Sequence, residues 1–198
     1  DEGNELTDLL PQAKMLIDDK AKDVVTRDLQ QGRYFGIAKR MGLAYEPYAY
    51  KAVMNNLKDN EWWAAQLIES GYKSDELLAY IEKEIKLGES NLKQDNQEGK
   101  LVDVPGIFDY VLQAIRHQVS KGEKFVFVGL TSPERRVRNG SVKVLQCWIE
   151  DTNKSLKEIS PTLYAHLAEI VDDESSPELQ EKMREILDNK YSGKNKED

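Results

Sequence analysis

One phrase occurs twice near the C-terminal end of this 198-residue chain. In each copy, serine, proline and glutamate precede apolar residues at helical spacing: Ser132-Pro133-Glu134 before Val137, and Ser176-Pro177-Glu178 before Met183. The two serines lie 44 positions apart, and self-similarity at a period of this size is typical of stacked helical repeats. Repeat stacks more often present a surface than a catalytic pocket, so the phrase bears on function as well as on fold.

The composition is rich in charge and poor in long apolar runs. Hydrophobic residues make up 39% of the chain and charged residues 32%, a balance typical of helical proteins with long solvated faces. The formal net charge is −8, which repels phosphate backbones unless basic residues cluster. We therefore expect a protein partner rather than nucleic acid. No apolar run approaches the roughly 18 residues that span a bilayer, so no membrane partner is expected.

Apolar residues recur at helical spacing along the chain, and the fold class we predict is all-α. Residues 125–128 (Phe-Val-Phe-Val) are aromatic and β-branched, which alone favours a strand. Because no second strand is available to pair with them, we predict a short buried helix there. Ser74 is expected to cap a helix that carries Leu77. Further helices are expected at 134–151, 160–172 and 177–190.

The chain is long enough for one domain with a substantial core, and residues 1–198 are predicted to form a single helical-repeat domain. Its flexible parts are expected at 1–6, in the polar loop 91–103 and in the tail 191–198. The single cysteine, Cys147, stands among apolar residues and is expected to be a buried thiol. It fits a reducing compartment, and we expect a cytoplasmic protein. Since the chain begins at Asp1 rather than Met, a removed leader stays an open alternative.

The segment Ile159–Leu187 resembles the HEAT repeat, a hairpin of two helices. In that family an inner helix ends in an apolar pair and Asp, a short turn carries Pro, and an outer helix follows; here the turn runs from Asp172 to Pro177. Residues 125–148 look similar, with Val137-Arg138 at the family's Val-Arg position, and a fainter copy spans Ala49–Gly71. Two departures stand out. Gly140 lies in mid-helix where Ala is usual, at a cost of about 1 kcal/mol, and Lys182-Met183 replaces Val-Arg.

The resemblance implies a short α-α superhelix, a right-handed stack of HEAT-like hairpins. An extra hairpin at 74–119 would lie between the first two copies. Each hairpin carries an apolar stripe that its own partner helix cannot cover, and stacking buries that stripe. We expect Leu145 and Leu167 to be buried between hairpins. The resemblance also implies that the face of the inner helices holds a protein partner.

A basic cluster is the first group of candidate binding residues: Arg135, Arg136, Arg138 and Lys143. Arginine at the start of a helix opposes the helix dipole by a few tenths of a kcal/mol each. This slightly unfavourable placement indicates that the arginines have another role, such as binding acidic groups. The alternative is that Arg138 pairs with an acidic residue of the adjoining turn.

Trp62 and Trp63 form the second group of candidate binding residues. Neighbouring positions on a helix point about 100° apart, so one ring can face the core while the other faces a groove or solvent. In the alternative, both rings pack between hairpins.

No cofactor or metal is predicted. His117 and His166 are the only histidines, and neither has a second histidine or cysteine at metal-ligand spacing. Whether the chain is an enzyme is left open, with a non-enzyme favoured. We predict a non-catalytic protein-protein interaction module, such as an acidic inhibitor or immunity-type binder of a basic protein. The alternative is a nucleic-acid-binding or DNA-glycosylase-like HEAT protein that uses a concave aromatic and basic groove.

Overall fold

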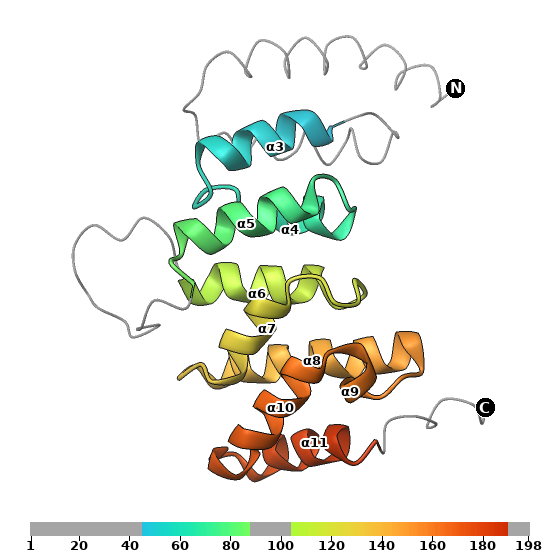
Figure 1. The fold of residues 1–198 in the computed structure, drawn as a ribbon. Helices are drawn as coiled ribbons and strands as arrows, with labels where there is room; N and C mark the ends of the chain where they lie inside the picture. The colour runs from blue at the N-terminus through green and yellow to red at the C-terminus, as the bar shows by residue number, and fades with distance from the viewer. Residues whose placement is uncertain (1–44, 88–103, 190–198) are drawn as a thin grey trace, which may run out of the picture.

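The computed structural model describes residues 45–87 and 104–189, and every regular element within these ranges is helical (Figure 1). In chain order the elements are α3 (Glu46–Asn55), α4 (Glu61–Glu69), α5 (Ser74–Glu84), α6 (Val104–Ala114), α7 (Glu123–Leu130), α8 (Arg135–Thr152), α9 (Leu156–Ile159), α10 (Pro161–Ile170), the 3₁₀ helix η1 (Val171–Asp173) and α11 (Pro177–Leu187). The predicted all-α class is confirmed for this part of the chain. The expected flexible segments 1–6, 91–103 and 191–198 lie outside it.

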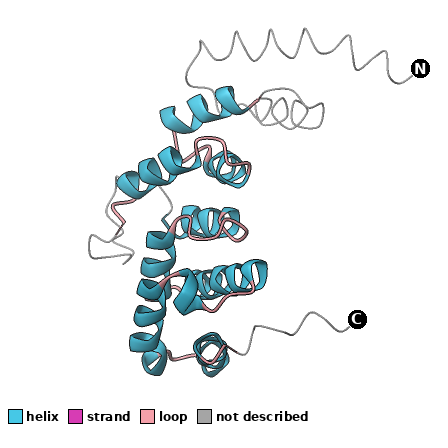
Figure 2. Cartoon of the chain, turned by 45° about the vertical axis from the view of Figure 1, so that its right-hand side comes forward, coloured by secondary structure: helices cyan, strands magenta, loops and turns pink. Residues whose placement is uncertain are grey.

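The helices follow one another in layers from α3 at one end to α11 at the other (Figures 1 and 2). One row is continuous, because α4 packs on α3 and α6, α6 packs on α8, and α8 packs on α11. The intervening helices lie beside this row: α5 contacts α4, α7 contacts α6 and α8, and α10 contacts α7 and α11. The first row therefore contains α4, α6, α8 and α11, and the second row contains α5, α7 and α10.

The segment at 125–128 is helical, as predicted, and forms the middle of α7. Phe125 and Val126 are buried, and the Phe125 ring meets Phe108 of α6 edge to face, with 5.8 Å between ring centroids. A lone helix satisfies its own backbone, which a lone strand cannot do. Phe125 and Val126 fill the core beside α6 and α8, whereas Phe127 is 38% exposed and Val128 is half-buried, so the predicted burial is confirmed for only part of the segment.

The core runs through all the layers and carries the side chains predicted to fill it. Leu145 of α8 and Leu167 of α10 are fully buried. Trp148 is also fully buried, and its indole Nε1 donates a hydrogen bond to the Ile115 carbonyl at 3.0 Å, which fastens α8 to the end of α6. Cys147 is a buried thiol, and burial raises its pKa. None of the helices in residues 45–87 and 104–189 is long and apolar enough to span a membrane.

Two glycines allow neighbouring helices to approach α8 closely. A Cβ at Gly129 of α7 would lie 2.2 Å from Ser141 Oγ, a distance at which the Ser141 side chain or the helices would have to move. A Cβ at Gly140 would lie 3.1 Å from Leu112 Cδ1 of α6. The intrinsic helix cost expected at Gly140 thus accompanies tight packing of α8 against α6.

The prediction that Ser74 caps α5 is wrong. Lys73 occupies the N-cap position in the left-handed region, with φ 48°, and Ser74 is the first residue of the helix. The Ser74 side chain is buried and accepts a hydrogen bond from Lys121 Nζ at 2.7 Å. Its hydroxyl therefore connects α5 to the loop before α7 instead of satisfying the first turn of its own helix.

Candidate functional site

An open pocket of about 510 Å³ lies between α6, α8 and α11, and we call it the α8 pocket. Its polar walls come from three helical stripes. Asp109, Gln113 and the following Arg116 come from the α6 side; Arg136, Asn139, Lys143 and Gln146 come from α8; Glu178 and Lys182 come from α11. Within each stripe the spacing is three or four residues, which places side chains on one face of a helix. The pocket is thus the meeting place of three polar faces above a buried core.

Two of the four cations in the α8 pocket are held by carboxylates of the same pocket. Arg136 pairs with Asp109 across α8 and α6. Lys182 pairs with Glu178 at 2.7 Å, and Arg135 reaches the same carboxylate at 3.3 Å. The Lys182 ammonium is the main reason that the pKa of Glu178 lies below its ordinary value. These pairs leave the pocket lining mixed in charge rather than uniformly basic.

The other two cations, Arg116 and Lys143, are placed differently. Arg116 Nε is buried and has no hydrogen-bond partner among the described residues. Lys143 is exposed on the middle of α8. Both positive charges act on the thiol of Cys147, where they oppose the rise in pKa that burial causes. The two cations therefore share one neighbourhood beside α8.

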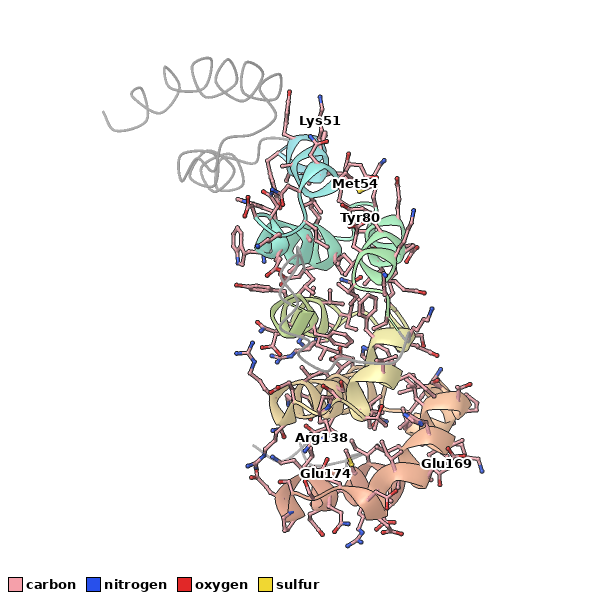
Figure 3. All side chains as sticks on the ribbon, turned by 90° about the vertical axis from the view of Figure 1, so that its left-hand side faces the viewer. Lys51, Met54, Tyr80, Arg138, Glu169 and Glu174 are labelled. Carbon is pink, nitrogen blue, oxygen red and sulfur yellow. The ribbon has the colours of Figure 1, made fainter. Side chains whose placement is uncertain are left out.

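Arg138 belongs to a different place from the rest of the predicted basic cluster. Its Nε and Nη2 donate to the two carboxylate oxygens of Glu174 at 2.7 and 3.1 Å, and its Nη1 donates to the Ser132 and Pro133 carbonyls at 2.8 and 3.0 Å. The Glu174 side chain is only 3% exposed, and Figure 3 shows it against Arg138. The alternative in which Arg138 pairs with an acidic residue of the adjoining turn is therefore what the structure contains.

The predicted basic cluster is split by the geometry of α8. Arg136 and Lys143 line the α8 pocket, Arg135 lies at its edge through Glu178, and Arg138 faces the α10–α11 turn. Sequence reasoning missed Arg116, Lys182 and their acidic neighbours in the pocket. A signal was present, because Asp109, Gln113 and Arg116 repeat at helical spacing along a polar stripe.

The two tryptophans lie on α4, away from the α8 pocket. Trp63 is 6% exposed and packs against Tyr45, with 5.8 Å between ring centroids. Trp62 is 46% exposed and meets Trp63 edge to face at 4.5 Å. The alternative in which both rings are buried is wrong, and the interpretation with one ring in the core and one toward solvent is confirmed.

Each histidine has a local partner. His117 Nδ1 lies 2.9 Å from an Asp151 carboxylate oxygen. The His166 ring stacks on Phe127 at 3.7 Å, and its Nε2 lies 3.2 Å from the Phe127 carbonyl oxygen. Within the described ranges there is no group of three or more His, Cys, Asp or Glu side chains that could hold a metal ion.

Comparisons with protein-family models, with curated proteins and with solved structures found no match to the chain.

Proposed function

We propose that the chain is a non-catalytic protein-binding module that holds a partner protein in the α8 pocket, which lies on α6, α8 and α11 and not on the inner-helix face that the resemblance to HEAT repeats implies. The mixed charge of that pocket carries the proposal. Four cations face it, but Asp109 and Glu178 stand among them and neutralise Arg136 and Lys182. A nucleic-acid backbone places like charges at regular intervals and is best met by cations alone. A protein segment with a few charged side chains fits alternating charges better.

The overall arrangement supports a HEAT-like stack, which is the finer part of the proposal. Along the chain, α3 with α4, α7 with α8, and α10 with α11 are successive packed helix pairs, and in the last two pairs one helix belongs to each row. The expected extra hairpin at 74–119 would comprise α5 and α6, each of which contacts α4. The Arg138–Glu174 pair joins the last two hairpins at the turn where the resemblance to HEAT repeats is clearest. We infer a short right-handed superhelix on these grounds.

The rival proposal of a nucleic-acid-binding or glycosylase-like protein receives less support. It requires an aromatic side chain beside the cations, to stack on a base. The exposed Trp62 lies on α4, whereas the cations of the α8 pocket lie on α8, α11 and the end of α6. No aromatic residue is among the described side chains that line the pocket.

Site-specific photo-crosslinking tests the proposed function. A benzophenone amino acid is placed at Asn139, which lines the α8 pocket, or at Ala165, which is exposed on α10. The two variants are irradiated in lysate of the source cells. We expect a discrete protein adduct from position 139 that is absent from position 165 and lost when Lys143→Glu is added. Adducts that are removed by nuclease, or identical protein adducts from both positions, would contradict the proposal.

A further inference from the structure

We propose that Arg116 and Lys143 form a carboxylate-binding subsite within the α8 pocket, which takes an Asp or Glu side chain of the partner segment. This inference rests on the proposed function and names the chemistry of the segment that the pocket holds.

The cations of the α8 pocket differ in whether a carboxylate of the same chain already pairs with them. Asp109 forms an ion pair with Arg136, and Glu178 forms ion pairs with Lys182 and Arg135. No acidic side chain within ion-pairing distance is found for Arg116 or Lys143 among the described residues. An incoming carboxylate would meet these two charges without displacing an acidic side chain of the described ranges. At the other cations it would first have to compete with Asp109 or Glu178.

The Arg116 guanidinium is only partly satisfied within the described part of the chain. Its Nε is shielded from solvent and lacks an acceptor among the described residues. A buried donor without an acceptor is unfavourable, and native structures generally provide it with a partner. The planar guanidinium fork matches the two oxygens of a carboxylate, and the ammonium of Lys143 adds a second charge from α8. A bound carboxylate would draw the guanidinium toward the pocket and supply the missing acceptor.

The walls of the α8 pocket restrict how many negative charges a ligand can carry. Asp109 and Glu178 lie on the α6 and α11 walls of the same pocket. A ligand with a single negative charge at Arg116 and Lys143 avoids both, whereas a run of phosphates would bring further negative charges toward them. The exposed Gln113 side chain adds an uncharged hydrogen-bonding group to the pocket lining. The subsite therefore fits an isolated acidic side chain better than a polyphosphate or nucleic-acid backbone.

Fluorescence anisotropy with a labelled, end-capped peptide that carries a single glutamate tests the subsite, and the same peptide with glutamine in place of glutamate is the neutral control. Binding is measured at about 150 mM salt, where screening suppresses long-range attraction. The subsite variant is Arg116→Gln/Lys143→Gln. Its matched control is Lys51→Gln/Lys58→Gln, which removes the same two positive charges from exposed positions near α3. Circular dichroism melts establish that both variants fold.

We expect the subsite variant to bind the single-glutamate peptide about tenfold more weakly than the wild type, a change of about 1.4 kcal/mol in binding free energy. The control variant should change affinity by less than about twofold. Equal losses in both variants, or no binding of the single-glutamate peptide by the wild type, would overturn the subsite. So would displacement of the peptide by inorganic phosphate at concentrations where free glutamate does not displace it. The proposed function is tested independently of the subsite, because a protein adduct at position 139 would still support a protein partner if the subsite failed.

Discussion

Arg138 and Glu174 show how one residue pair can hold α8 to the turn between α10 and α11. The Arg138 guanidinium donates to the Glu174 carboxylate and to the Ser132 and Pro133 carbonyls, and its side chain is only 14% exposed. The Glu174 carboxylate also accepts a hydrogen bond from the Ser176 backbone N–H at 2.8 Å. A charge this deep is favourable only while its partner is present, because the lone ion would remain buried.

Arg138→Met should therefore lower the free energy of unfolding by about 3 kcal/mol, since breaking a buried pair leaves Glu174 uncompensated. The double variant Arg138→Met/Glu174→Met should lose less than the single variant. Arg184→Met is the control, because Arg184 pairs with Asp172 where both side chains are exposed, and such pairs contribute about 0–1 kcal/mol. Urea denaturation followed by circular dichroism measures all three. Equal losses in Arg138→Met and Arg184→Met would contradict a buried structural role for Arg138.

The same pair makes stability depend on pH in a defined direction. The hydrogen bonds from Arg138 are the main reason that the pKa of Glu174 lies below its ordinary value. A lowered folded-state pKa gives a contribution that is complete above the unfolded pKa, about 4.3, and is lost as the pH falls through the folded value. The difference in unfolding free energy between wild type and Glu174→Gln should be constant from about pH 7 to 5.5 and shrink at lower pH. A constant difference down to about pH 3 would show that Glu174 does not titrate in this way.

At the scale of single elements, α7 and α8 depend on a close backbone approach. Gly129→Ala would place its Cβ against Ser141 Oγ, and overpacking of this kind costs about 1–3 kcal/mol. Adding Ser141→Ala removes the oxygen that the new methyl group meets, so the double variant should recover most of the lost stability. Thermal and urea unfolding of the two variants measure the effect. A double variant no more stable than Gly129→Ala would indicate that helix propensity or another contact, rather than this clash, governs the site.

The packing of α8 and α10 gives a second test at this scale. Leu145 and Leu167 are fully buried, and truncating a core leucine leaves a cavity. Leu145→Ala and Leu167→Ala should each lower the free energy of unfolding by about 2–5 kcal/mol. Equilibrium denaturation provides the measurement, and the exposed substitution Thr162→Ala on α10 provides the reference. Losses below about half a kcal/mol at both leucines would mean that the helix faces are assigned wrongly.

Periodicity predicted these elements well, because an apolar stripe depends only on residues of the same helix. The α7 helix also followed from local reasoning, since an unpaired strand at 125–128 has no way to satisfy its backbone. The α8 pocket did not follow in the same way. Arg136 and Lys143 were recognised from their sequence, but their neighbour Arg116 comes from another helix, and only tertiary packing brings α6 against α8. The predicted N-cap role of Ser74 was wrong for a similar reason, because Lys121 of the loop before α7 donates a hydrogen bond to the Ser74 hydroxyl.

At the scale of the whole molecule, the net charge of the chain is negative whereas the lining of the α8 pocket is locally positive. The chain carries −8, yet the α8 pocket gathers four cations with only two carboxylates. Long-range attraction to any polyanion is weak under these conditions, so recognition has to come from short-range contacts inside the pocket. This contrast favours a partner that offers a few acidic side chains over one that offers a continuous line of phosphates.

The central claim, that the pocket serves a protein partner and not nucleic acid, is tested most directly with labelled duplex DNA. Fluorescence anisotropy is measured at about 50 and 150 mM salt, on the wild type and on Arg135→Ala/Arg136→Ala, because phosphate contacts weaken steeply as salt rises. We expect no measurable binding by the wild type at the higher salt. Tight binding that persists at the higher salt and falls in the double variant would contradict the claim and favour the nucleic-acid alternative.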